Sequence, residues 1–141
     1  MSYAKNGKLE DWVHTYLLSD GHNPEFSEGL RLLDRYFLGP INMPLSLFHR
    51  CCGPEGNMKW TIPEQDFEQK VEYLETVISA ENDLPPLIVH YVNGEFELND
   101  GNHRLEAYSR LGIKKYYVIV WITEKEEYHS FIEEYSEYME T

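Results

Sequence analysis

Residues 98–107 read Leu-Asn-Asp-Gly-Asn-His-Arg-Leu-Glu-Ala. A strand predicted over residues 95–98 runs into a tight polar turn, and the turn leads directly into a short helix. Gly101 allows the backbone to turn sharply and lets a ligand approach closely. The first turn of a helix has N–H groups without intrahelical partners and a partial positive charge, so it can hold an anion. His103 and Arg104 would add two side-chain donors, and the stretch therefore predicts a site for phosphate.

We call residues 100–104 the phosphate cradle. The same residues also suit a turn that binds nothing, because Asn, Asp and Gly are common in turns and at helix N-caps. A short motif of this kind is a weak signal when it stands alone. The choice between the two interpretations therefore depends on the elements that surround the turn.

The composition limits the classes of protein to which this chain can belong. Its 141 residues are enough for one domain with one core. No apolar run approaches the ~20 residues of a membrane-spanning helix, and the N-terminus lacks the apolar stretch of a signal peptide. We therefore expect a cytoplasmic protein without a membrane partner. The net charge of −13 argues against general DNA binding, because such binding depends on Lys and Arg at the phosphates.

The two cysteines, Cys51 and Cys52, are adjacent in the sequence. Adjacent cysteines are badly placed for a mutual disulfide, because a bridge needs a specific separation and direction of the side chains. His49 stands two residues before Cys51, but a structural zinc site uses four ligands, usually from two spaced pairs. The sequence predicts neither a disulfide framework nor a zinc site, and it leaves the role of these cysteines open.

Apolar residues recur at helical or strand spacing along most of the chain. The pattern predicts α-helices over residues 8–18, 26–37, 64–80, 102–112 and 123–141, and strands over residues 41–48, 87–92, 95–98 and 116–122. Phe26, Leu30, Leu33 and Phe37 form the stripe of the second helix, which we expect to end before Gly39-Pro40. Asn93-Gly94 is a strong hairpin signal.

Four motifs stand in a characteristic order between residues 41 and 122. They are Pro63-x-x-Asp66-x-x-x-Lys70-Val71, Leu84-Pro85-Pro86-Leu87-Ile88-Val89, Asp100-Gly101-Asn102-His103-Arg104-Leu105-Glu106-Ala107-Tyr108, and the strand over residues 113–122. In order and in motifs, this region resembles the ParB/sulfiredoxin superfamily, whose signature is a Gly-x-His-Arg-x-x-Ala helix. The first 40 residues and the last helix lie outside the resemblance.

The resemblance implies a fold class and a division of the chain. We expect a single α+β domain over residues 1–141, with a small mixed sheet and packed helices. Residues 1–40 would form an N-terminal helical hairpin, residues 41–122 the ParB/sulfiredoxin-like core, and residues 123–141 a C-terminal helix.

The resemblance also implies a binding site for ATP, ADP or another nucleotide. The residues that it points to as phosphate ligands are Lys70, Gly101, Asn102, His103 and Arg104, with Arg50 as an upstream basic ligand. Lys and Arg side chains would neutralise the phosphates, while the helix N-terminus would supply N–H donors.

Two further roles belong to carboxylates. Mg²⁺ would be held by the nucleotide phosphates and one carboxylate, for which Asp100 and Asp66 are the candidates. A kinase also needs a base that takes the proton of the acceptor. Asp100 and Glu106 are the candidate catalytic residues, and the sequence does not choose between them.

One position separates this chain from sulfiredoxin. Asn102 occupies the place of the sulfiredoxin catalytic cysteine, and an amide cannot act as a thiolate nucleophile. We therefore do not expect sulfiredoxin activity. ParB itself carries an Arg-rich box and a helix-turn-helix domain, which the motifs of this acidic chain do not include, so we expect neither partition activity nor DNA binding.

Three functional hypotheses follow. The first is a nucleotide-binding domain that transfers or hydrolyses phosphate at the phosphate cradle. The second is a non-catalytic module that senses a nucleotide or binds a partner protein through its N-terminal hairpin and acidic C-terminal helix. The third is a ParB-like nuclease, which the negative charge disfavours.

Overall fold

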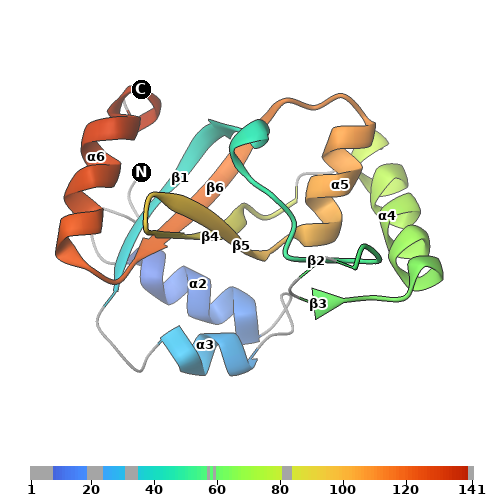
Figure 1. Cartoon of the computed structure of the whole chain (residues 1–141), viewed down its shortest axis with the longest axis horizontal. Helices are drawn as coiled ribbons and strands as arrows, with labels where there is room; N and C mark the ends of the chain where they lie inside the picture. The colour runs from blue at the N-terminus through green and yellow to red at the C-terminus, as the bar shows by residue number, and fades with distance from the viewer. Residues whose placement is uncertain are drawn as a thin grey trace.

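The structure is a computed structural model that describes residues 8–18, 24–30, 35–56, 58, 60–80 and 84–139. Figure 1 shows a central sheet with helices on both of its faces and a helix pair at one end. The elements are α2 (Lys8–Leu18), α3 (Pro24–Leu30), β1 (Tyr36–Pro44), the 3-10 helix η1 (Leu45–Leu47), β2 (Cys52–Gly53), β3 (Trp60–Thr61), α4 (Glu64–Ser79), β4 (Leu87–Val92), β5 (Glu95–Asp100), α5 (Asn102–Arg110), β6 (Lys115–Ile122) and α6 (Lys125–Met139).

The main sheet is mixed, and its strand order is β1-β6-β4-β5. β1 pairs with β6 in antiparallel fashion, β6 with β4 in parallel, and β4 with β5 in antiparallel fashion. The hairpin between β4 and β5 turns at Asn93 and Gly94, whose φ angles are 55° and 76°. Positive φ at both positions matches the turn type that Asn-Gly favours. The α+β class and the mixed sheet that the sequence predicts are therefore confirmed.

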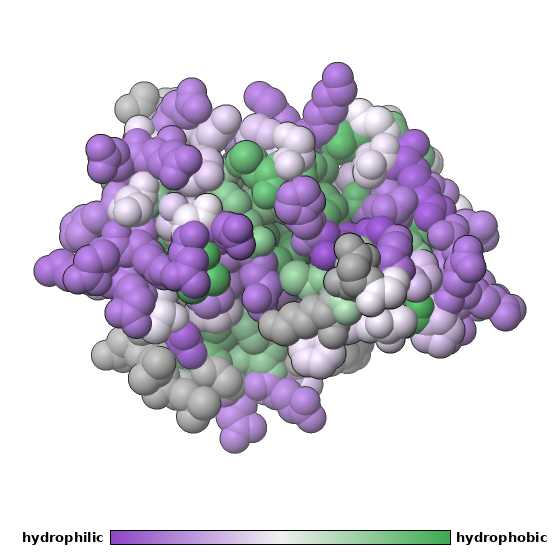
Figure 2. Space-filling model, viewed as in Figure 1, coloured by the Kyte–Doolittle hydropathy of each residue, from purple (hydrophilic) through white to green (hydrophobic). Residues whose placement is uncertain are grey.

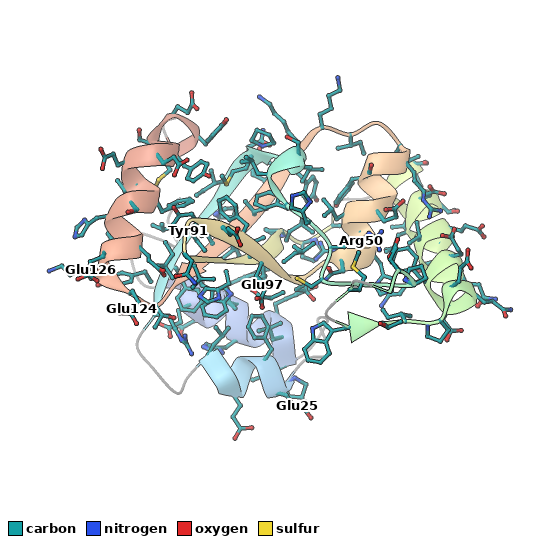
Figure 3. The ribbon with its side chains drawn as sticks, in the orientation of Figure 1. Glu25, Arg50, Tyr91, Glu97, Glu124 and Glu126 are labelled. Atoms are coloured by element: carbon teal, nitrogen blue, oxygen red, sulfur yellow. The ribbon has the colours of Figure 1, made fainter. Side chains whose placement is uncertain are left out.

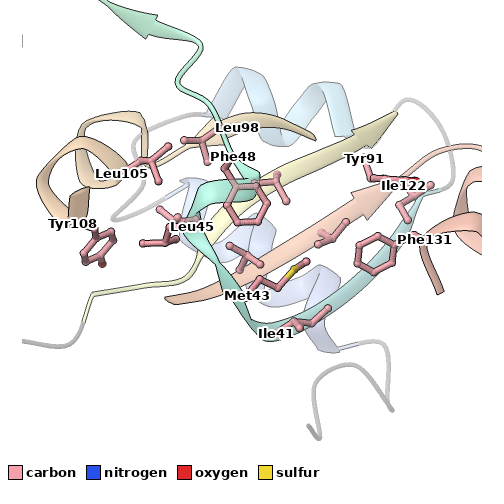
Figure 4. Close-up of a cluster of buried hydrophobic side chains, with 14 residues drawn as sticks. Ile41, Met43, Leu45, Phe48, Tyr91, Leu98, Leu105, Tyr108, Ile122 and Phe131 are labelled. Carbon is pink, nitrogen blue, oxygen red and sulfur yellow. The ribbon is translucent and has the colours of Figure 1, made fainter. Parts of the chain in front are cut away.

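Side chains of the central strands alternate between the two faces of the sheet, as the period of two requires. On one face, a buried cluster joins the sheet to α2 and α3. This cluster consists of Val13, Leu17, Leu30, Ile88, Ile119 and Trp121. On the other face, a larger buried cluster lies under α6, η1 and part of α5, and Figure 4 shows ten of its members by name, among them Tyr91 and Phe131.

The helix pair α4 and α5 packs at the end of the sheet through a third cluster. It consists of the buried residues Phe67, Val71 and Ala107. The apolar stripe that predicts a helix over residues 64–80 is the same stripe that faces α5. This packing places His103, in the N-terminal turn of α5, next to Phe67 near the start of α4, so it fixes the surroundings of the phosphate cradle.

The prediction of a helix over residues 26–37 is wrong in its extent. α3 ends at Leu30, and Phe37 lies in β1, paired with Trp121 of β6. The predicted stripe residue Leu33 falls outside the described residues. Gly39-Pro40, which we expected to end a helix, instead lies within β1 at an irregularity between Leu38 and Ile41.

Sheet pairing explains this outcome, because a strand at the edge of a sheet tolerates a proline without an N–H donor. Gly39 has a φ of 122°, and a Cβ there would lie 2.6 Å from the carbonyl oxygen of Val118. β1 therefore begins at Tyr36 and crosses the predicted boundary between residues 40 and 41. Pro44, which predicts an edge strand, ends β1 at the edge of the sheet.

The described residues between η1 and α4 include the two-residue strands β2 and β3, which pair in parallel. The helices of the described part of the chain are all too short or too polar to cross a membrane.

Candidate functional site

The phosphate cradle joins the end of β5 to the start of α5. Gly101 has φ 102° and ψ 22°, in the left-handed region that favours glycine. A Cβ at this position would collide with the Cδ2 atom of Leu87, so the turn also needs glycine for space. The first bond inside the helix runs from the Leu105 N–H to the Gly101 carbonyl, at 2.8 Å. The N–H groups of residues 102–104 precede this bond and have no acceptor within the helix.

Asn102 is buried, and its side chain bonds to two parts of the backbone. Its Oδ1 atom accepts a hydrogen bond from the Cys51 N–H at 2.6 Å, and its Nδ2 atom donates to the Leu98 carbonyl at 3.1 Å. The amide thus ties the segment after η1 to the start of α5. Its predicted contact with phosphate stays a prediction.

Arg104 and Asp100 form an ion pair at 3.0 Å beneath the turn, with side chains that are 8% and 17% exposed. Arg104 also donates to the Pro85 carbonyl, and Asp100 accepts from the Tyr16 hydroxyl at 3.1 Å. The pair thereby connects β5, α5, the Pro-Pro segment and α2. The predicted role of Arg104 as a phosphate ligand stays a prediction, and so does that of Asp100 as a base or Mg²⁺ ligand. In the structure these two side chains are paired with each other.

Three basic residues from three segments converge beside the turn. Burial, the charge of Lys70 and the charge of Arg50 lower the pKa of His103 to about 4. The His103 ring lies 5.2 Å from the ring of Phe67, and the Arg50 guanidinium carbon lies 4.7 Å from the same ring. Lys70 is exposed on α4, and within the described part of the chain its ammonium group has no hydrogen bond or ion pair. The structure therefore brings together Arg50, Lys70 and His103, and their predicted role as phosphate ligands stays a prediction.

Arg50 is held by carboxylates on two sides. Its Nη1 and Nη2 atoms donate to the two oxygens of Glu55 at 3.1 and 2.6 Å, and its Nε atom lies 3.3 Å from Oε1 of Glu106. The Arg50 guanidinium lowers the pKa of Glu55. Figure 3 shows Arg50 between the β2–β3 segment and α5. The Arg50 guanidinium is thus already oriented to bind an anion, and the Glu55 carboxylate is bound to it.

The charges continue along α5 and α4. Glu106 accepts a hydrogen bond from Arg110 at 2.8 Å, and Arg110 donates to both oxygens of Glu68 at 2.7 and 2.6 Å. Sequence reasoning found Glu106 but missed Glu55, Glu68 and Arg110. The spacing of four between Glu106 and Arg110 is a local signal for a pair on one helix. The contact of Arg110 with Glu68 spans 42 positions and depends on how α4 and α5 pack.

The candidate metal ligands do not gather. Asp66 is exposed in the first turn of α4, while the Asp100 carboxylate is paired with Arg104 within the cradle. Across the described residues, no group of three or more His, Cys, Asp or Glu side chains is arranged to hold a metal ion. The role in binding Mg²⁺ that the resemblance implies for Asp100 or Asp66 stays a prediction.

Comparison with known proteins gives one family. A family model described as the ParB N-terminal domain matches residues 59–134, which is more than half of the chain. This range contains Lys70 and the phosphate cradle and leaves Arg50 outside. A search of curated proteins finds no match.

Two solved structures are similar to the chain. One is sulfiredoxin from Arabidopsis thaliana, at 22% identity and a TM-score of 0.39, covering 68% of this chain and 96% of that one. The other is a Pnob8-like ParB-N domain, at 15% identity and a TM-score of 0.41, covering 73% of this chain and 37% of that one. Both likenesses are too distant to indicate an activity.

Proposed function

The chain belongs to the ParB N-terminal domain family, and we propose that it binds a nucleotide through its phosphates at the start of α5. The observation that carries this proposal is the convergence of Arg50, Lys70 and His103 beside N–H groups of the first helical turn. A helix N-terminus and several cationic donors together favour a multiply charged anion. Such a local group matters more in a chain of net charge −13, where basic residues are few.

In this proposal, each residue has a defined task. Lys70 and Arg50 neutralise the phosphates, and backbone N–H groups in the first turn of α5 donate to them. The imidazole of His103 is neutral before binding, because its pKa is about 4, and a nearby phosphate raises that pKa. The pair of Arg104 and Asp100 keeps the turn in shape.

Calorimetry tests the binding step. We expect ATP and inorganic tripolyphosphate to bind the full chain, and Lys70→Ala to weaken both by about fivefold or more, a difference of roughly 1 kcal/mol. Lys115→Ala is the matched control, because Lys115 is also an exposed lysine but lies at the start of β6. Absence of binding to the unmodified chain would refute the proposal, and so would equal losses in the two variants.

Transfer or hydrolysis of phosphate at the cradle extends this proposal. Glu106 or Asp100 would act as the base, and Mg²⁺ would bind the phosphates with Asp66 or Asp100 as its protein ligand. Incubation with ATP and Mg²⁺, followed by chromatographic analysis of the nucleotides, tests the extension. Conversion of ATP to ADP that Glu106→Gln abolishes supports catalysis, and unchanged ATP with full binding contradicts it.

One observation favours a second function, in which the domain senses a nucleotide without reacting with it. Both candidate bases are ion-paired, Asp100 with Arg104 and Glu106 with Arg50 and Arg110. A carboxylate held by a guanidinium is a poorer proton acceptor than one that faces a substrate hydroxyl alone. Binding without turnover is the outcome that this arrangement favours. A supercoiled plasmid that remains intact with Mg²⁺ would set aside the nuclease alternative.

A further inference from the structure

A second concave site lies on the other side of Arg50 from the phosphate cradle. It is a cavity of about 740 Å³ between residues 45–50 and the exposed side of α5. Buried Leu45, Phe48 and Leu105 form its apolar floor, and Figure 4 shows these three side chains close together. This volume falls within the range of pockets that bind small molecules, about 300–1,000 Å³. In Figure 2, hydrophobic surface appears near the middle of this face, between hydrophilic surfaces on either side.

The cavity is held open by hydrogen bonds at both of its ends. Beyond the C-terminus of α5, the Leu45 N–H donates to the Lys114 carbonyl at 2.8 Å. At the N-terminus of α5, the Cys51 N–H donates to Asn102 Oδ1 at 2.6 Å. Residues 45–51 therefore span α5 from one end to the other and are fixed at two points. A segment fixed in this way cannot collapse onto the helix without losing one of these bonds, so the cavity is part of the fold.

The charges around the cavity indicate the kind of ligand. Arg50 and Glu106 line one end of the cavity, where they pair with each other, with 3.3 Å between Arg50 Nε and Glu106 Oε1. Lys114 lines the other end, and its ammonium group has no hydrogen bond or ion pair with the described residues. An anionic group on a ligand would therefore bind at Lys114, while an apolar ring would cover Leu45 and Phe48.

We propose that this cavity binds a small organic acid with an aromatic body and one anionic group. The aromatic body removes apolar surface of the floor from water, and the anionic group pairs with Lys114. This ligand differs from the one proposed for the phosphate cradle, which is multiply charged and needs no apolar body. The two sites are therefore separable by experiment, and the cavity does not depend on the proposed nucleotide.

The fluorescent dye 8-anilinonaphthalene-1-sulfonate is the probe, because it combines aromatic rings with a single sulfonate. We expect one saturable site on the full chain, which Lys114→Glu weakens by about fivefold or more. Ser109→Trp places a large ring in the cavity from an exposed position on α5, and we expect it to abolish the signal. Lys115→Glu makes the same change of charge at the neighbouring residue, which does not line the cavity, and it should leave dye binding unchanged.

Two outcomes would overturn the proposal. The first is equal weakening by Lys114→Glu and Lys115→Glu, which would reduce the effect to net charge. The second is retention of the dye by Ser109→Trp, which would place the dye elsewhere. Urea unfolding midpoints equal to that of the unmodified chain show that a loss of signal is not a loss of fold. Dye binding that persists in a Lys70→Ala variant separates this result from any failure of the phosphate cradle.

Discussion

The side chain of Asn102 accepts the Cys51 N–H at 2.6 Å, across 51 positions of sequence. The same amide donates to the Leu98 carbonyl at 3.1 Å. One buried residue thus joins the end of β5, the start of α5 and the segment that follows η1. The chain thus has a structural link between the phosphate cradle and the wall of the cavity.

Asn102→Ala should destabilise the chain by about 1–3 kcal/mol, because it leaves a backbone donor and a backbone acceptor without their partner. Urea unfolding followed by circular dichroism measures the change. Asn42→Ala removes an amide from an exposed position of β1 and serves as the control, with an expected change within about 0.5 kcal/mol. Similar changes for the two variants would mean that the Asn102 bonds contribute little.

The ion pair of Arg104 and Asp100 makes a second prediction about stability. Arg104→Met should destabilise the chain by about 3 kcal/mol or more, because it leaves the Asp100 carboxylate without its charged partner in a largely buried position. The double variant Asp100→Asn, Arg104→Met should be less destabilised than the sum of the two single variants. A double-mutant cycle measures the coupling between them. Strict additivity would contradict the pairing.

Because of His103, the free energy of unfolding should decrease as the pH falls through the acid range. Its pKa in the folded chain is about 4, below the ordinary value of 6.5, so the unfolded chain binds a proton that the folded chain resists between these values. This contribution is fully present above about pH 6.5 and is lost as the pH falls toward about 4. The urea midpoint of the unmodified chain should therefore decrease more between pH 7 and pH 5 than that of His103→Gln. The other titrating groups are common to both chains, so parallel curves would contradict the shift.

Glu55 should compete with any anion that binds at Arg50. Its two oxygens accept from the guanidinium at 3.1 and 2.6 Å at an exposed position, where ion pairs are weak, so an incoming anion can displace them. Glu55→Gln should therefore strengthen the binding of tripolyphosphate by about threefold, measured by calorimetry.

Glu25→Gln provides the matched control for this prediction. Glu25 is an exposed carboxylate on α3, and Figure 3 shows it far from Arg50 in the same view, on the helix that covers the opposite face of the sheet. The two variants change the net charge equally. An increase in affinity of the same size for both would show that the effect comes from the overall field and not from competition at Arg50.

The sequence was sufficient where the signal was local. Asn93-Gly94 predicts its hairpin because the turn type depends on those two residues. The stripe on α4 predicts a buried face, and Phe67 and Val71 are buried. The stripe through Phe37 was misleading, because an apolar spacing of three and four also occurs when a helix is followed closely by a strand. Pairing with Trp121 of β6 determines the conformation of Phe37, and that contact lies 84 positions away.

For the candidate site too, the sequence indicated some residues but not the contacts that they make. The sequence pointed to Arg50, Lys70 and His103. In the structure Arg50 and His103 both lie against Phe67, and the charge of Lys70 is near enough to lower the pKa of His103. The sequence did not indicate that Asn102 and Arg104 have their side chains bonded within the fold. Both residues have ordinary polar side chains in a turn, and only the positions of Cys51 and Pro85 decide which atoms they contact.

The strand order β1-β6-β4-β5 has a consequence for the way in which the chain folds. The β4–β5 hairpin and the cradle are local in sequence, so their contacts close short loops. β1 meets β6 across a long separation, with Ile41 beside Val118, and such contacts raise the contact order and slow folding. The cavity needs the segment that follows β1, so it forms only after this late pairing. We therefore expect an early nucleus that contains the cradle and a transition state in which the cavity is still absent.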